Sequence, residues 1–267
     1  DLHSFPTRRS SDLEPDAALF ALLAYASSWL RCHQHPAFVA GLLNSQPMGF
    51  YAPAQLVADA RRHGVVFRPV DVQVSDWDCT LERSDHGNAE VRLGLRLVAG
   101  LQEAEGLRIE AARLDSPFED VESLAHRAQL NPRTLALLAR AGALNALATH
   151  RREAHWRAIG IERLPGMLAG ASAREPHLAL PAPNEAQEII ADYQGLGLTL
   201  GRHPVELLRA KLTKRGVHRS ADLHAIPNGA RVRVAGLVTH RQRPETASGW
   251  LPWFYYALAD NRTMFMF

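Results

Sequence analysis

Two glycine turns, about forty residues apart, constrain the fold of this 267-residue chain more than any other sequence feature. The first lies in Leu95–Gln102 (LRLVAGLQ) and precedes a helical pattern that contains Ile109. The second lies in Leu135–Leu144 (LALLARAGAL), and we expect the next helix to begin at about Asn145. Glycine adopts left-handed backbone conformations that are costly for other residues. The sequence therefore predicts two pairs of helices, each joined by a tight turn.

The helix after each turn would present free backbone N–H groups at its positive end, which suits a phosphate oxygen. This is the helix-hairpin-helix arrangement, which grips the duplex backbone without reading bases. In the first turn Gln102 replaces the usual second glycine, with Gly106 at the small position, which weakens the prediction of a tight phosphate approach there. The candidate DNA-binding residues are Gly100, Leu101, Arg140, Gly142, Arg151 and Arg152. The alternative is that both glycines are ordinary helix caps and that the arginines form a solvated face.

The remaining chain has the signals of a mainly α fold. Residues 17–31 are apolar on almost every side, which predicts a buried helix. Short β-like runs flank a polar turn at residues 84–88. Period-two alternation from Ala230 predicts a half-buried strand. Helix starts are predicted at His35-Pro36, at Pro53, at a capping box over Ser116–Glu119, at Asn131-Pro132, and at Asn184 with Gln187.

Composition and motifs exclude several classes. No apolar run reaches the roughly 18 residues of a membrane span. Two cysteines are too few for a disulfide framework, which favours the reducing cytoplasm. The net charge of +2 neither requires nor excludes an anionic partner. Cys32–His35 lacks a second pair of metal ligands, and the carboxylates of Asp76 and Asp78 form only a common D-x-D pattern. We predict no cofactor for this chain.

The two ends differ from the rest. Residues 1–13 resemble the conceptual translation of a sequencing adapter, so we leave them out of the fold prediction. Residues 250–267 hold seven of the nineteen aromatic residues, which suggests a frameshifted tail that is disordered or prone to aggregation. The alternative for this end is a real pair of aromatic strands.

Longer motifs carry a family resemblance over residues 17–249. The stretch from SSWLRCHQHPAFVAGLLNSQPMGFYAPAQLV through SDWDC resembles the fingers region of bacterial C-family DNA polymerases, the class of the polymerase III alpha subunit. The phrases NSQPMGFYAPAQLV and LGLTLGRHPVELLR are most similar to the error-prone paralogue, which acts in damage-induced translesion synthesis. The resemblance implies a fragment from the C-terminal half of such an enzyme.

The resemblance also implies an order of parts. Residues 14–90 would end the fingers, 91–150 would form the tandem helix-hairpin-helix, and 151–228 would be the helical remainder of the clamp-binding region, with a linker at 164–185. Residues 229–249 would start an OB-fold that the divergent tail truncates. The family's metal-binding aspartates lie in an upstream palm domain, and no motif here matches them. Mg²⁺ would therefore serve only the parent polymerase, and we expect no catalytic residue and no polymerase activity in this chain.

Partners and rival functions follow from these expectations. The expected partners are duplex DNA, the missing palm of the parent polymerase, the sliding clamp and other translesion-synthesis proteins. We expect no association with a membrane. The short apolar peptide His177–Pro181 is faintly similar to clamp-docking peptides. Two alternatives to a polymerase fragment remain: a stand-alone, non-enzymatic helix-hairpin-helix module that binds DNA, and a helical scaffold whose glycine turns are only caps.

Overall fold

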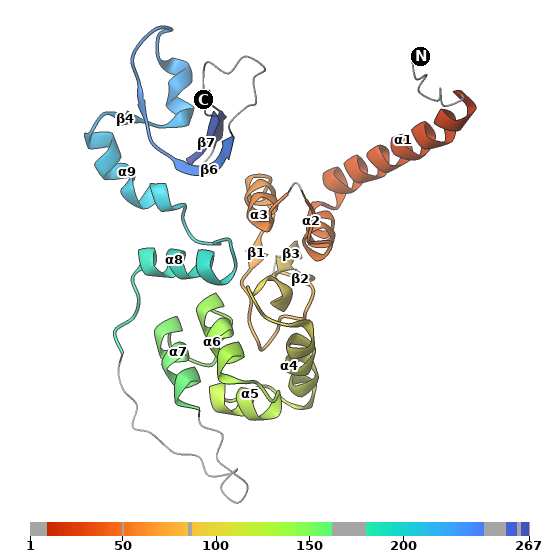
Figure 1. The fold of residues 1–267 in the computed structure, drawn as a ribbon, viewed down its shortest axis with the longest axis vertical. Coiled ribbons are helices and arrows are strands. Elements are labelled where there is room, and N and C mark those ends of the chain that lie inside the picture. The colour runs from red at the N-terminus through yellow and green to blue at the C-terminus, as the bar shows by residue number, and fades with distance from the viewer. Residues whose placement is uncertain are drawn as a thin grey trace, which may run out of the picture. The chain divides into compact units, whose positions relative to one another are not determined.

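The computed structural model describes residues 10–49, 51–84, 87–161, 180–242, 255–260 and 263–266, and it is mainly helical (Figure 1). The mainly α fold class predicted from the sequence is thereby confirmed. The chain divides into two compact units. The first comprises Asp1–Pro183 with Ala191–Leu198, and the second comprises Asn184–Ile190 with Thr199–Phe267.

The first unit begins with three helices, α1 (Ser10–His33), α2 (His35–Asn44) and α3 (Pro53–Arg62). Proline occupies the first turn of α2 and of α3, as the sequence predicts. Residues 10–13 of the adapter-like segment belong to α1, and residues 1–9 lie outside the described residues.

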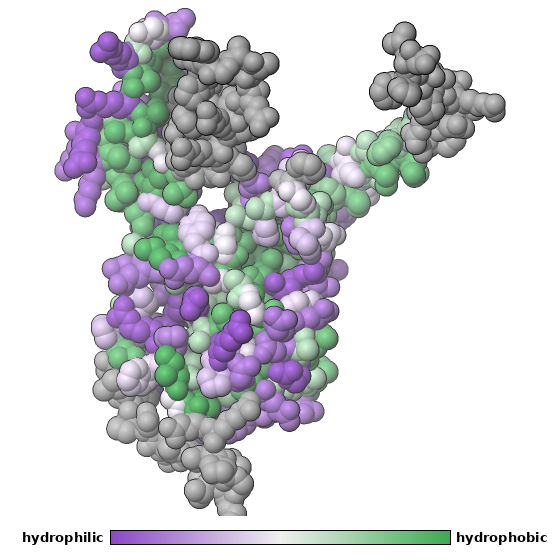
Figure 2. Space-filling model, in the orientation of Figure 1, coloured by the Kyte–Doolittle hydropathy of each residue, from purple (hydrophilic) through white to green (hydrophobic). Residues whose placement is uncertain are grey.

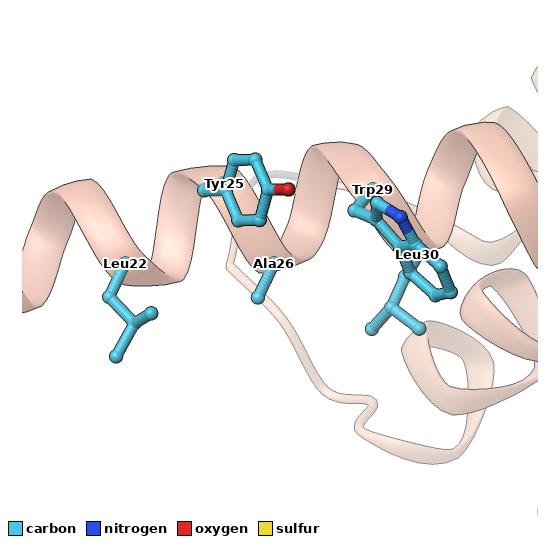
Figure 3. Close-up of a pocket in the computed structure, with 5 residues that line it drawn as sticks. All are labelled: Leu22, Tyr25, Ala26, Trp29 and Leu30. Carbon is cyan, nitrogen blue, oxygen red and sulfur yellow. The ribbon is translucent and has the colours of Figure 1, made fainter.

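The prediction that residues 17–31 form a buried helix is correct for the helix and wrong for its burial. All of these residues are exposed in α1. Leu22, Ala26 and Leu30 point to one side of the helix, and Tyr25 and Trp29 complete a shallow apolar surface (Figure 3). Apolar composition shows that a helix can be buried but not which element covers it, and the described part of the chain leaves much of this surface exposed. The exposed large apolar side chains of α1 are Leu19, Phe20, Leu22, Leu23, Tyr25, Trp29 and Leu30.

A small sheet follows α3. Its strands are β1 (Phe67–Arg68), β2 (Thr80–Arg83) and β3 (Ala89–Arg92), in the order β1-β3-β2. β3 pairs parallel with β1 and antiparallel with β2. The predicted polar turn joins β2 to β3, and its residues 85 and 86 lie outside the described residues.

Four helices and a short 3-10 helix complete the body of the first unit. They are η1 (Leu95–Leu97), α4 (Glu103–Asp115), α5 (Val121–Arg127), α6 (Pro132–Ala141) and α7 (Arg151–Gly160). α7 packs against both α5 and α6, and α4 packs against α5 (Figure 1). The largest fully buried side chains here include Leu93, Leu95, Ile109, Leu124, Leu135, Leu138 and Leu144.

The capping box predicted at Ser116–Glu119 is wrong, because α5 starts at Val121. The side chain of Gln73 donates to the Phe118 carbonyl at 2.6 Å and accepts from the Phe118 N–H at 3.0 Å. Both backbone groups are therefore used before the helix begins. Asp120 caps α5 instead, accepting from the Ser123 N–H at 2.7 Å.

The second unit is built around α9 (Pro204–Lys214). α8 (Glu185–Gly195) contributes residues to both units, and its start is closed by reciprocal hydrogen bonds between Asn184 and Gln187, as predicted. After α9 come β4 (Val217–His218), the 3-10 helix η3 (Ser220–Ala225) and β5 (Arg233–Val234), and β4 pairs parallel with β5.

Three more strands end the chain: β6 (Leu237–Gln242), β7 (Tyr255–Asp260) and β8 (Thr263–Met266). They form an antiparallel sheet in chain order, consistent with the start of an OB-fold. β7 and β8 match the alternative of a strand pair rather than the disorder expected of residues 250–267. The frameshift itself stays a prediction. Among the described helices, none is both long and apolar enough to cross a membrane.

Candidate nucleic-acid interface

The first glycine turn leads from η1 into α4. Gly100 is exposed and has φ of +85°, a conformation that favours glycine. Leu101 is buried, with 7% of its surface exposed, and its N–H donates to the Val98 carbonyl at 3.1 Å. Leu101 therefore anchors the turn to the core, and Gly100 is the part of the turn that solvent reaches.

Acidic side chains close the start of α4. The Glu105 carboxylate accepts from the backbone N–H of Gln102 at 3.2 Å and from the Thr134 hydroxyl at 2.5 Å. Glu103 adds a second acidic side chain in the same turn. These carboxylates place negative charge where the sequence predicted a phosphate, so the start of α4 is poorly suited to an anion.

Gly106 is small for a packing reason. A Cβ atom built there would lie 2.5 Å from the indole ring of Trp77. Trp77 thus packs directly on the backbone of α4, and any larger residue at position 106 would displace it. Packing against Trp77 therefore explains the small residue at position 106 of the predicted motif. The local sequence pattern does not reveal this contact.

The second glycine turn ends α6. Asn131 caps the start of this helix, and Gly142 ends it with φ of +76°, as predicted. The predicted helix from Asn145 is wrong, because residues 142–147 form turns and α7 begins at Arg151. The later start follows from a capping pair: the His150 ring accepts from the Glu153 N–H at 3.1 Å, and the Glu153 carboxylate accepts from the Thr149 N–H at 2.9 Å.

Glu153 is buried beneath this second connection, with 6% of its surface exposed. Burial alone would raise the pKa of its carboxyl. The hydrogen bonds from Thr149 and the nearby Arg157 guanidinium, which donates at 2.6 Å, outweigh burial and lower that pKa below its ordinary value. Glu153 is therefore a charged, hydrogen-bonded group that fixes the start of α7.

Arg151 and Arg152 have partners within the protein. The Nη2 atom of Arg151 lies 2.5 Å from Oδ1 of Asp192, and the two side chains are only 11% and 18% exposed. The Arg151 guanidinium also covers Gly142, where a Cβ atom would lie 2.7 Å from Nη2. Arg152 donates to the Pro181 carbonyl at 2.8 Å and so ties the end of the linker to α7.

The structure places the first turn beside the end of α6. The Ala99 N–H donates to the Gly195 carbonyl at 2.8 Å, and Gly195 packs so closely on α6 that a Cβ atom would lie 2.9 Å from the Arg140 carbonyl oxygen. Gly100 packs on Leu137, one helical turn before Arg140. Arg140 is exposed and forms no ion pair within the described part of the chain. Of the six candidate DNA-binding residues, Gly100 and Arg140 are thus the exposed ones, and the backbone at each of these two positions lies close to Gly195.

The carboxylates of Asp76 and Asp78 are each paired with an arginine. Asp76 accepts from Arg113 at 2.5 Å, and Asp78 accepts from Arg96 at 2.5 Å. Within the ranges that the structure describes, His, Cys, Asp and Glu residues form no cluster of three or more that could hold a metal ion. Cys32 is exposed and Cys79 is buried, and both are free thiols.

Three contacts that shape the site were missed from the sequence. Asp192 lies 41 residues beyond its partner Arg151, and Gly195 lies about fifty residues beyond the end of α6 that it contacts, and no local pattern links either residue to its partner. His150 is an unusual N-cap residue, so its pairing with Glu153 was not expected. His177–Ala179 of the clamp-like peptide lie outside the described residues.

Comparisons with known proteins first define the class of the site. Residues 64–154 match the family model of the helix-hairpin-helix motif, a range that contains both glycine turns. Most of the chain then aligns with larger proteins named error-prone DNA polymerase. Identity is 54% with the protein of Aromatoleum aromaticum, over 89% of this chain, and 55% and 50% with those of an Azoarcus species and Pseudomonas paraeruginosa, each over 88% of it.

The alignments cover 23% of the length of each of these relatives. The chain is therefore homologous to part of the error-prone C-family DNA polymerases, and the resemblance seen in the sequence is confirmed.

Proposed function

We propose that this chain holds duplex DNA by its phosphates as one part of an error-prone C-family DNA polymerase. The match of residues 64–154 to the helix-hairpin-helix motif carries the proposal. The geometry narrows it to the exposed backbone at Gly100 and the end of α6, which carries the exposed Arg140, and excludes the acidic start of α4. An arginine next to an exposed backbone turn suits a phosphate oxygen, because the guanidinium donates several hydrogen bonds in one plane.

The proposed role is positional and not catalytic. The parent enzyme would join nucleotides in translesion synthesis with Mg²⁺ held by a palm domain, which we expect to lie outside this chain. Here Asp76 and Asp78 are committed to arginine partners, which supports a structural role for both carboxylates. Other proposed partners are the sliding clamp and other translesion-synthesis proteins, and the proposed location is the cytoplasm.

The exposed apolar surface of α1 supports the fragment over a stand-alone module. Seven large apolar side chains of one helix are exposed in the described part of the chain. Apolar patches of this kind are rare on free monomers and mark contact surfaces. We propose that the palm of the parent polymerase, or a segment joined to it, covers α1 in the whole enzyme.

A salt titration of DNA binding tests the proposal. The purified chain is mixed with a fluorescent duplex, and the association constant is measured by anisotropy at a series of salt concentrations. Phosphate contacts predict a straight decline of log K with log salt, with a slope of about −0.9 for each contact on duplex DNA. Absence of binding, or a slope near zero, would overturn the proposed duplex holding.

Primer extension tests the second half of the proposal. The same chain, supplied with primed template, nucleotides and Mg²⁺, should extend no primer. Metal-dependent synthesis by this chain alone would show that it contains a reaction centre and would overturn the purely positional role.

A further inference from the structure

The net positive charge of the chain comes from the second unit. Residues 199–237 contain 8 of the 30 Lys and Arg residues but only 2 of the 28 Asp and Glu residues. Both lysines of the protein, Lys211 and Lys214, are among them. The rest of the chain therefore carries more acidic than basic residues, although the whole chain has a net charge of +2.

Strand pairing gathers several of these cations in one place. β4 follows the end of α9 and pairs in parallel with β5, so that Val217 is opposite Arg233 and His218 is opposite Val234. The Arg233 side chain donates to the Arg215 carbonyl at 3.4 Å, which links β5 to the turn after α9. Backbone pairing thus brings together residues far apart in the sequence, here called the β4–β5 basic cluster: Lys214, Arg215, His218, Arg219, Arg231 and Arg233.

All six residues of the cluster are exposed. Within the described ranges none of them forms an ion pair, whereas Arg202 of the same unit is paired with Glu185. Hydrophilic residues gather over α9 and β4 in the space-filling view (Figure 2). Asp222 in η3 is the nearest acidic residue in the sequence. The cluster therefore has charge that no described part of the protein neutralises.

Helix stabilisation explains only part of the cluster. Lys211 and Lys214 lie in the last turn of α9, where cations interact favourably with the helix dipole. Arg219, Arg231 and Arg233 lie outside α9 and receive no such benefit. Close packing of like charges outside a helix end costs free energy, so a binding partner is the simplest reason for it.

We propose that the β4–β5 basic cluster binds the phosphodiester backbone of DNA, as a contact separate from the helix-hairpin-helix turns. The cations extend over a helix end, two strands and their flanks. An extended cationic surface suits a repeating polyanion better than a single phosphate ion. Arginine predominates, and its planar fork matches phosphate oxygens.

The test compares two arginine-to-glutamine substitutions in the full chain. Arg231→Gln removes a charge from the cluster, and Arg83→Gln removes a charge from β2 in the first unit, where Arg83 is also exposed and forms no ion pair within the described part of the chain. Each variant is titrated against a single-stranded oligonucleotide, a duplex of the same length and polyglutamate, over a range of salt concentrations. Circular dichroism and thermal unfolding verify that both variants fold.

Arg231→Gln should reduce the salt slope by about 0.7 on the single strand, or by about 0.9 if the bound backbone is duplex, and Arg83→Gln should leave both slopes unchanged. The doubly substituted Arg219→Gln/Arg231→Gln chain should lose about twice as much slope. Equal slopes for the parent chain and the Arg231 variants on both DNAs would overturn the proposal. An equal loss on polyglutamate would also overturn it, because the surface would then attract any polyanion. The proposed duplex holding by the first unit is judged separately, from Arg140.

Discussion

The two glycine turns have the same role in the sequence but different surroundings in the structure. Both glycines have positive φ, and both join helical segments. Gly100 is exposed beside the end of α6, and α4 begins three residues later. Gly142 is buried beneath the Arg151 guanidinium, and α7 begins only at position 151.

The difference shows that a turn motif reports backbone geometry and not accessibility. The Arg151–Asp192 ion pair makes the second turn inaccessible to DNA. Asp192 lies in α8, far along the chain from this turn. The first turn has no such cover among the described residues. The second turn is therefore structural, and the proposed DNA contact is at the first turn with Arg140.

The largest effect on stability is expected from breaking the Arg151–Asp192 ion pair beside the second turn. Arg151→Ala leaves Asp192 without its guanidinium and exposes Gly142. We expect a loss of about 2–3 kcal/mol in unfolding free energy, below the range for fully buried pairs because both side chains keep some exposure. Urea unfolding measures it. Arg152→Ala is the control, with a smaller expected loss, and an equal loss for the two variants would contradict the proposed role of Arg151.

Replacing each turn glycine with alanine compares the stability of the two turns directly. A left-handed conformation costs alanine about 1–2 kcal/mol, which applies to Gly100→Ala and Gly142→Ala alike. The second substitution must also displace the Arg151 guanidinium, since its Cβ would lie 2.7 Å from Nη2, whereas the nearest atom to a Cβ at position 100 is 3.4 Å away. Thermal unfolding should show the larger loss for Gly142→Ala. The reverse order would mean that the two turns have been assigned incorrectly.

The stability that Glu153 contributes at the second turn should depend on pH. Its pKa is lowered in the folded chain, so its stabilising contribution is complete above the ordinary value of 4.5 and declines as pH falls through the folded pKa. Glu153→Gln should cost about 1–2 kcal/mol at neutral pH, because it weakens a buried charge-assisted hydrogen bond. Denaturant unfolding at several pH values should show the difference from the parent chain shrinking below pH 4.5. A difference that stays constant with pH would exclude this role for the ionised carboxylate.

Much of the local structure could be predicted from residue types. Proline at the start of α2, α3 and α6, Asn131 as a cap and Gly142 as a terminator are all short-range signals, and each is confirmed. These signals act through neighbouring backbone groups, which are within reach of a sequence pattern. The assignment of Gly100 and Gly142 to turns depended on the same local chemistry.

Several of the errors have long-range causes. α1 has the composition of a buried helix, but its exposure depends on which other segments are present. The start of α5 was misplaced because Gln73, forty-five residues earlier, binds the Phe118 backbone. Partners such as Asp192 and Trp77 determine whether Arg151 or Gly106 faces solvent, and sequence spacing does not encode those contacts.

The smallest expected effect is the most direct test of the account. Arg140→Gln and Arg61→Gln each remove an exposed arginine from the last turn of a helix, α6 and α3 respectively, so their effects on helix stability should match. Arg140→Gln should reduce the salt slope of duplex binding by about 0.9, whereas Arg61→Gln should leave the slope unchanged. Equal slopes for the two variants would contradict the claim that duplex DNA lies against the exposed first turn and Arg140.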